Sequence, residues 1–358
     1  MTNLKKVGLT ALAGSLAAVS AQAGELSVSG GASITYVTGE TANSAAAIGQ
    51  ASGFTLSGSG DLDNGWSVSH DIVFGSAGAY SSSGTTITMG SLGSIGTGSA
   101  LSINGAYDEA YPRAYEEATD GDASGSDAFN DMGAFAGTNA LIYNAPALDI
   151  AGSSVAIGVE YSPNAGSNAT AGSGQARTDA TGDSLGVGVT ITTDMGLTLG
   201  AYGAQMSDDT AAAAGVDARQ DAFDGTWFAN YSMGPISVGY QTSYIDRGIE
   251  TDATNSTAAK TVGTSGGIFE GEAVSVAFNV NDDFSISYTD KEDTYDNQDD
   301  KGTSAGQSDV TMTTESLQVA YSMGSMSIKA YSTETTNPNF DDGADARTVT
   351  EIALGIAF

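Results

Sequence analysis

The sequence predicts an all-β protein, a 16-stranded antiparallel transmembrane β-barrel. Three observations predict this fold: apolar and small polar residues alternate along many short segments, the connections between these segments alternate between short and long, and the last segment ends in an aromatic residue. The chain has 358 residues, no Cys, one His and a formal net charge of -32. The negative charge excludes nucleic acid as a partner. The lack of Cys excludes disulfides and thiolate chemistry, and a single His excludes a His-rich metal site within one subunit.

Residues 1–23 have the features of an export signal. Lys5 and Lys6 precede an apolar run from Val7 to Val19, and Ala21-Gln22-Ala23 supplies a cleavage site. This order is typical of a secretory signal peptide, which we expect to be cleaved after Ala23; a short buried helix is the alternative. No later stretch has the roughly 20 consecutive apolar residues of a membrane-spanning helix. The exported chain, residues 24–358, is therefore either soluble or a barrel.

The first predicted strand illustrates the alternation. Even positions from Leu26 to Tyr36 are mostly apolar, whereas odd positions from Ser27 to Thr35 are small or polar. Successive side chains of a strand point to opposite faces. A soluble sandwich would carry long charged side chains on its wet face, but here Ser, Thr, Gly, Ala and Asn dominate it. This pattern favours a barrel with an apolar outside and a polar lumen.

The same alternation places sixteen strands, an even number as in bacterial barrels. We predict them at 25–38, 51–60, 65–76, 84–90, 94–104, 139–149, 152–162, 183–193, 196–206, 224–233, 235–246, 268–280, 283–293, 309–323, 325–335 and 346–358. Short turns such as Met233-Gly234-Pro235 and Met323-Gly324-Ser325 alternate with long polar connections. Short periplasmic turns at one rim and long outer loops at the other are the layout of outer-membrane barrels.

The last strand resembles the signal by which outer-membrane barrels are recognised for insertion. Phe358, Ile356 and Leu354 point to one face, with Ala357 and Gly355 on the other. Pairing of this strand with the one that starts near residue 25 would close the sheet and remove its edges.

Several short motifs together resemble the general-diffusion porins of Gram-negative bacteria, especially the alphaproteobacterial type. They are the opening Gly24-Glu25-Leu26-Ser27-Val28-Ser29-Gly30, the hairpin from Met89 to Gly98 and the terminal Phe358, and they follow an export signal. The resemblance implies sixteen strands, a homotrimer, and a third long loop that folds inward and narrows the pore. It further implies a passive channel for small hydrophilic solutes and ions, located in the outer membrane among lipids and lipopolysaccharide and inserted by the barrel assembly machinery.

The third long loop, about 105–138, is strongly acidic. By the resemblance its carboxylates would line the pore constriction, where a ring of acidic groups favours cations; alternatively, they are a solvated charge run. These residues are Asp108, Glu109, Glu116, Glu117, Asp120, Asp122, Asp127 and Asp131, against a single Arg113.

The chain departs from better-known porins, which carry a cluster of Arg on the early-strand wall. No Lys or Arg occurs between Lys6 and Arg113. Candidate basic wall residues therefore come from late strands, namely Lys291, Lys329 and Arg347, although these can equally be isolated residues near a rim. We expect a preference for cations.

A calcium site is a further candidate in the same loop. Asp120, Asp122, Ser124 and Asp131 partly match the oxygen spacing of a calcium-binding loop. The match lacks the terminal bidentate Glu and flanking helices, so calcium is an optional ligand and no other cofactor is expected.

Two competing classes remain. An enzyme would need a nucleophile with a base, but His70 lies within a predicted strand and no matching Ser motif accompanies it, so we expect no catalysis. A soluble or surface-attached acidic β-rich protein stabilised by calcium, such as a sheath or adhesin, is the stronger rival, although it leaves the terminal Phe358 unexplained.

Overall fold

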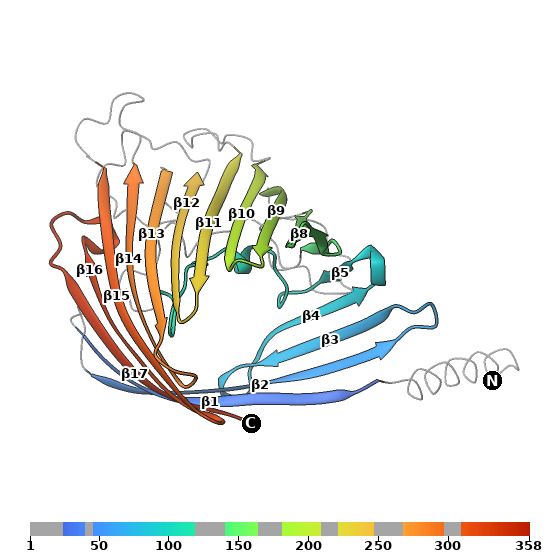
Figure 1. Ribbon diagram of the computed structural model, residues 1–358, viewed down its shortest axis with the longest axis horizontal. Coiled ribbons are helices and arrows are strands. Elements are labelled where there is room, and N and C mark those ends of the chain that lie inside the picture. The colour runs from blue at the N-terminus through green and yellow to red at the C-terminus, as the bar shows by residue number, and fades with distance from the viewer. Residues whose placement is uncertain are drawn as a thin grey trace, which may run out of the picture.

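The computed structural model describes residues 24–39, 46–118, 140–163, 181–208, 221–246, 268–296 and 309–358. One antiparallel sheet contains all the strands (Figure 1). The strands are β1 Leu26–Gly39, β2 Ala47–Asp61, β3 Ser67–Phe74, β4 Tyr80–Thr88, β5 Ser94–Thr97, β6 Leu141–Asn144, β7 Leu148–Ile150, β8 Ser153–Ser162, β9 Thr181–Thr193, β10 Leu197–Asp208, β11 Ala222–Met233, β12 Ile236–Asp246, β13 Ile268–Asn279, β14 Phe284–Asp296, β15 Val310–Met323, β16 Met326–Thr336 and β17 Arg347–Ala357. Short 3-10 turns lie at Ser76–Gly78, Gly90–Leu92, Asn104–Ala106 and Pro338–Phe340.

β6 and β7 together form one strand of the barrel, because both pair with β8. Between the pairs Asn144–Gly158 and Leu148–Val155, the strand formed by β6 and β7 has one residue more than β8. Pro146 lies in this interruption and has no N–H to offer the ladder. The barrel therefore has sixteen antiparallel strands, as the sequence predicts, with a bulge in the sixth.

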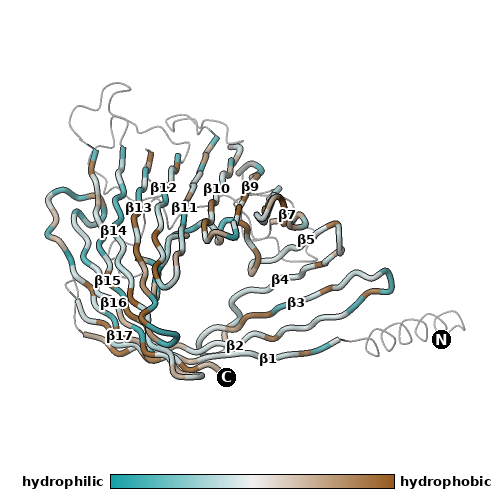
Figure 2. The backbone as a smooth tube through the Cα atoms, viewed as in Figure 1, coloured by the Kyte–Doolittle hydropathy of each residue, from teal (hydrophilic) through white to brown (hydrophobic). Residues whose placement is uncertain are grey.

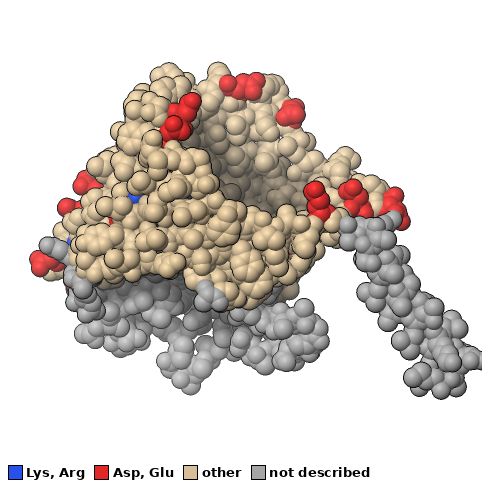
Figure 3. All heavy atoms as spheres, turned by 90° about the horizontal axis from the view of Figure 1, so that it is seen from below, with Lys and Arg blue, Asp and Glu red and all other residues tan. Residues whose placement is uncertain are grey.

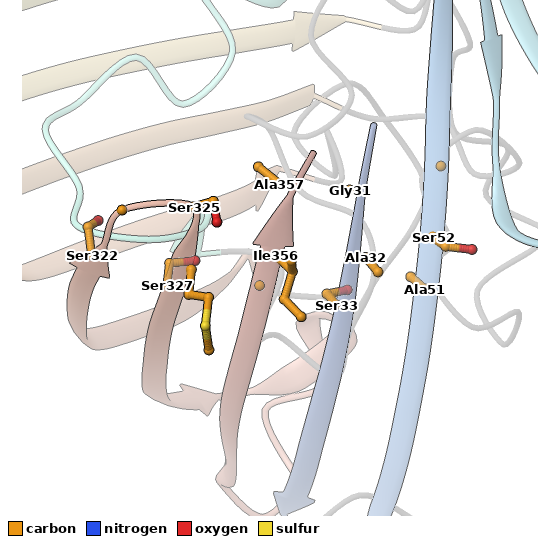
Figure 4. Close-up of a pocket in the computed structure, with 14 residues that line it drawn as sticks. Gly31, Ala32, Ser33, Ala51, Ser52, Ser322, Ser325, Ser327, Ile356 and Ala357 are labelled. Carbon is orange, nitrogen blue, oxygen red and sulfur yellow. The ribbon is translucent and has the colours of Figure 1, made fainter. Parts of the chain in front are cut away.

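The sheet closes where β1 pairs with β17. Gly30 and Phe358 exchange two backbone hydrogen bonds of 2.9 Å, and the ladder continues from Gly31–Ala357 to Gly39–Val349. Figure 4 shows this junction, where Gly, Ala and Ser of β1, β2 and β15 to β17 border a recess of about 450 Å³. The predicted closure is confirmed.

Connections of two kinds alternate along the barrel. Tight turns join β9 to β10, β11 to β12 and β15 to β16, each with a glycine at positive φ: Gly196 (84°), Gly234 (59°) and Gly324 (62°). The intervening connections are long, apart from the five residues between β3 and β4. The barrel thus has a rim of short turns and a rim of long connections.

Inward and outward side chains alternate along each strand. Outward Val274, Val276 and Leu317 are 54%, 43% and 55% exposed, whereas inward Ser275 and Ser316 are buried. Figure 2 shows apolar residues distributed along the strands and not collected in one core. Among the described residues, no helix is long and apolar enough to cross a membrane.

The largest difference from the predicted strand bounds is in β5. We predicted a strand at 94–104, but β5 ends at Thr97. Gly98 follows with φ of 137°, and a Cβ there would lie 2.2 Å from the carbonyl O of Ser83. Only glycine fits this sharp departure from the sheet.

Candidate functional site

The chain that leaves β5 runs inside the barrel. We call residues 98–118 the inner segment; Figure 1 shows this teal stretch inside the barrel, next to the yellow and orange strands. Its contacts follow the strand order: residues near its start bind β8 and β9, and residues near its end bind β16 and β17. It therefore covers the inner side of a wall that we call the covered wall, β8–β17.

The first contacts are aromatic and polar. Ile103 N–H donates to Oε2 of Glu160 on β8 (2.8 Å), and the Thr190 hydroxyl on β9 donates to the hydroxyl of Tyr107 (3.1 Å). The Tyr107 ring stacks on Tyr202 of β10, with ring centroids 5.5 Å apart. Together with Ala140, Ile142, Ala204 and Phe228, the residues Ile103, Tyr107 and Tyr202 form a buried cluster.

Glycines in the covered wall make space for this segment. A Cβ at Gly188 of β9 would lie 2.5 Å from the Tyr107 ring, and one at Gly239 of β12 would lie 2.2 Å from Cδ of Pro112. Real side chains do not tolerate such distances. These glycines therefore allow the inner segment to lie directly on the wall.

Two inward glutamines bind the backbone of the inner segment. Gln241 of β12 donates to the carbonyl O of Tyr107 (2.7 Å) and accepts from Ala110 N–H (2.6 Å). Gln318 of β15 repeats the arrangement: it donates to the carbonyl O of Glu116 (2.7 Å) and accepts from Tyr115 N–H (2.9 Å). Each amide satisfies one donor and one acceptor of a backbone that has left the sheet.

Hydroxyl and amide groups from β11, β13 and β14 fill the interval between the two glutamines. Asn230 of β11 donates to the carbonyl O of Ala110 (2.6 Å), and Ala114 N–H donates to the hydroxyl of Ser287 on β14 (2.9 Å). The Ser275 hydroxyl on β13 donates to the carbonyl O of Pro112.

A buried ion cluster lies beneath the inner segment. Lys291 Nζ is 3.6 Å from Oε1 of Glu109 and 3.2 Å from Oδ2 of Asp293, and all three side chains are 0% exposed. Buried charges of this kind must be paired, because removal from water is costly. Glu109 and Lys291, which we expected at the pore surface, instead join the inner segment to β14.

The end of the inner segment reaches the last two strands. The Tyr115 hydroxyl donates to Oε1 of Glu351 on β17 (2.9 Å), and its ring lies 6.1 Å from that of Tyr331 on β16. Lys329 Nζ lies 5.0 Å from the centre of the Tyr115 ring, within the range of a cation–π contact.

Arg113 and Glu117 form an ion pair of 3.0 Å on the open side of the segment, with side chains 30% and 29% exposed. Arg113 also donates to the backbone carbonyl of Glu109. These two side chains, unlike Glu109 and Lys291, present charge to the interior of the barrel.

The remaining predicted site residues lie in different places. Asp108 and Glu116 are half-buried in the inner segment, and Arg347 is half-buried at the start of β17. Phe358 is 76% exposed and Ile356 43% exposed at the end of the closing strand, and Leu354 is paired with Ile34. Residues 1–23 lie outside the described residues, as do the pore and calcium candidates Asp120, Asp122, Ser124, Asp127 and Asp131.

The described part of the chain shows no group of side chains arranged for catalysis or for metal binding. His70 points outward on β3, and its Nδ1 lies 2.8 Å from the hydroxyl O of Thr85 on β4. Within the described ranges, no three His, Asp or Glu side chains are grouped so as to hold a metal ion.

The glutamines and hydroxyls that hold the inner segment were not predicted from the sequence. One signal was present. Gln241 and Gln318 are long amides at inward positions where Ser, Thr and Gly predominate, and such side chains reach further into the barrel than their neighbours.

No protein-family model matches the sequence, and no curated protein matches it. Solved structures match most of its length. OmpF of Salmonella typhi, in complex with daunomycin, aligns with a TM-score of 0.60 and 13% identity over 94% of this chain and 98% of its own. OmpT of Vibrio cholerae, in a trimer form, aligns with a TM-score of 0.58 and 13% identity over 94% of this chain and 100% of its own. An anion-selective porin from Comamonas acidovorans aligns with a TM-score of 0.57 and 13% identity over 93% of this chain and 99% of its own. These similarities show a fold of the porin type.

Proposed function

We propose that this chain is an outer-membrane porin, a water-filled channel for the passive diffusion of small hydrophilic solutes and ions. The observation that carries the proposal is an inner segment fixed inside a closed barrel whose outward face is apolar. Outward Leu185, Val274 and Leu317 are at least half exposed. A ring of such side chains is unfavourable in water and favourable in lipid. The similar solved porins support the same function.

We further propose that the channel prefers cations. β1 to β5 contain no Lys or Arg. Lys291 is neutralised by two buried carboxylates, and Arg113 is paired with Glu117. On the face drawn in Figure 3, Asp and Glu lie around the edge of a hollow and few Lys or Arg are visible. Acidic groups near a narrow, low-dielectric passage attract cations and repel anions. The anion-selective relative in Comamonas acidovorans shares the fold, so selectivity must come from side chains.

A planar lipid bilayer tests both statements. The refolded protein should give stepwise conductance, and a KCl gradient should give a reversal potential of the sign expected for potassium. Heat-denatured protein is the control. Absence of steps would refute the channel, whereas chloride preference with normal steps would refute only the selectivity.

Extraction from membranes separates this proposal from the rival class. A porin requires detergent and changes its migration on gels after boiling. Release by a chelator alone would instead support a calcium-stabilised acidic surface protein.

We also propose a homotrimer whose protomers meet along the outward face of β2–β4. This face departs from the apolar rule: Gly58 is opposite His70, and His70 is opposite Thr85. Gln50 and Ser52 add further polar groups on β2. Such groups favour contact with protein over contact with acyl chains. The trimer form of OmpT from Vibrio cholerae supports this assembly.

Substitution Gly58→Trp should convert the trimer to monomers on native gels in mild detergent, because the indole would keep the two surfaces apart. Val276→Trp, on the outward face of β13, is the matched control and should leave the trimer intact. A Gly58→Trp protein that remains trimeric would rule out this interface.

The terminal strand carries the proposed recognition signal for the barrel assembly machinery. Phe358 is exposed beyond the last residue of β17 and is fixed by its backbone bonds to Gly30. Its aromatic side chain and outward Ile356 are thus available at the rim of short turns.

A further inference from the structure

The connection between β16 and β17 takes an indirect course. It comprises residues 337–346, which we call the strap, and it lies at the rim of long connections. β16 and β17 pair directly with each other, so a connection could pass straight from one to the next. Instead, the strap extends to the other side of β16. Asn337 Nδ2 donates to the carbonyl O of Thr311 on β15 (2.8 Å), and the Phe340 ring lies 5.9 Å from the Tyr295 ring on β14.

The side chain of Phe340 enters an apolar patch on the inner face of the barrel. We call it the outer patch and define it by Ile245, Phe269, Tyr295, Val310 and Met312 of β12–β15. Each of these residues lies an even number of positions from an inward residue of its own strand, as Phe269 does from Ser275, so all five point into the barrel. The Phe340 ring lies 5.5 Å from the Phe269 ring, edge to face, and Phe340 is 4% exposed. The strap is therefore docked inside the mouth of the barrel.

The backbone of the strap opposes this docking. Asn337, Asn339 and Phe340 have φ values of 49°, 60° and 55°, in the left-handed region. Asn tolerates this conformation, but for Phe it is sterically unfavourable. Three exposed Asp side chains follow between residues 341 and 345, and such a charged run favours water. Burial of the Phe340 ring and the hydrogen bond of Asn337 thus hold the strap against local strain, a combination typical of segments that switch.

We propose that the strap is a gate at the outer mouth of the channel, and that Phe340 is the latch that determines how large a solute can enter. With Phe340 in the outer patch, the strap narrows the mouth. When the ring leaves the patch, the backbone relaxes and the strap moves away from the opening. The outer patch lies closer to the rim of long connections than Gln241 and Lys291 do, so an entering solute meets the gate before the inner segment. The size limit rests on the proposed channel function, but the movement of the strap does not.

An introduced thiol can report this movement, because the chain contains no Cys. Met312→Cys places a thiol in the outer patch, where Met312 is 0% exposed and follows Thr311, whose carbonyl binds Asn337. The purified barrel in detergent is treated with the neutral reagent methyl methanethiosulfonate, and mass spectrometry follows the labelling. A buried thiol reacts only in the open state. Ser33→Cys, at an inward position of β1, is the control for access of the reagent to the interior.

Labelling of Met312→Cys should be slow compared with that of Ser33→Cys. Addition of Phe340→Ala removes the latch and should accelerate labelling about tenfold, because apolar burial that holds the strap is lost. Asn339→Ala leaves the outer patch intact but disfavours the left-handed backbone at an exposed position, and should accelerate labelling about fivefold. Gly343→Ala is the matched control within the strap: its φ lies outside the left-handed region and the nearest atom to the added Cβ is 3.4 Å away, so the rate should not change.

Liposome swelling tests the consequence for transport. In the Phe340→Ala and Asn339→Ala proteins, with Met312 retained, the entry of raffinose relative to that of the smaller arabinose should rise in step with the labelling rate. Both measurements report the fraction of barrels with an open strap. Gly343→Ala should leave the ratio of the two sugars unchanged.

Labelling of Met312→Cys as fast as that of Ser33→Cys, or labelling that neither Phe340→Ala nor Asn339→Ala accelerates, would overturn the proposal. Faster labelling without greater entry of raffinose would overturn the gate. Absence of swelling with either sugar would refute the channel and the size limit, whereas labelling would still decide whether the strap opens. Heat-dependent gel migration verifies that each variant folds. If Met312→Cys does not fold, Val310→Cys, 7% exposed in the same patch and closer to Cys in size, takes its place.

Discussion

The two sides of the barrel use the same alternating strands in different ways. On the covered wall, β8–β17, inward Gln241, Ser275 and Gln318 are buried beneath the inner segment. On the side formed by β1–β3, which we call the bare wall, no residue of the three strands is fully buried. Inward residues there are mostly Ser, Thr, Gly and Ala, and the exceptions include Val37, Val73 and the carboxylate of Asp71. One wall is thus built to hold a segment, and the other to face open space.

The difference shows how a barrel of uniform strands obtains an asymmetric interior. The covered wall has long amide side chains, glycines that leave space for the inner segment, and one buried lysine. The bare wall lacks this combination of three features. Substitutions on the two walls should therefore have unequal effects, and the following tests measure that inequality.

The largest effect is expected from Lys291→Met. The change leaves Glu109 and Asp293 buried without the lysine between them, and loss of one partner of a buried ion pair costs about 3–5 kcal/mol. Urea unfolding in lipid vesicles, followed by tryptophan fluorescence, measures this loss. Lys329→Met is the matched control: Lys329 is half-buried beside the Tyr115 ring, and its loss should cost about 1 kcal/mol. Equal losses for the two variants would contradict the assigned role of Lys291.

A smaller effect is expected from Gly188→Leu, which places a side chain where Tyr107 lies. Overpacking of this kind costs about 1–3 kcal/mol, and the loosened inner segment should add noise to the open-channel current. Ser33→Leu, at an inward position of the bare wall, is the control and should leave the noise unchanged. If Gly188→Leu gave a quiet channel of normal stability, the close contact between β9 and the inner segment would be disproved.

The smallest change in stability is expected from Arg113→Ala. Its ion pair with Glu117 is partly exposed, and such pairs contribute about 0.5 kcal/mol. The reversal potential in a KCl gradient should nevertheless move toward stronger cation preference, because a cation on the open side of the segment is lost. Glu117→Ala should move it the opposite way. Shifts of the same sign in both variants would show that the pair does not face the ion path.

Most of the fold follows from the sequence because alternation depends on local residue order. Sixteen strands, their inward faces and the closure by Phe358 are all visible in patterns of period two. The exceptions have local causes that the pattern does not express. Pro146 interrupts the sixth strand, and Gly98 turns the chain inward six positions before the predicted end of its strand.

The inner segment was harder to predict, because its contacts join positions far apart in the chain. Nothing near Glu109 in the sequence indicates that its carboxylate meets Lys291, and acidic residues look alike whether they face water or a buried lysine. The resemblance to porins indicated an inward loop but not which side chains hold it. The long amides Gln241 and Gln318, on an otherwise small and polar face, were the one readable signal.

The position of the inner segment in the chain has a consequence for the order of assembly. Residues 103–117 are synthesised before every strand from β8 to β17 that binds them, so their partners do not exist when they emerge. Contacts between residues so distant in sequence form slowly, because the loop entropy is lost before any bond is gained. The backbone groups that Gln241 and Gln318 later satisfy must meanwhile be hydrated. Docking of the inner segment is therefore expected to be a late step, after the ten strands of the covered wall have formed.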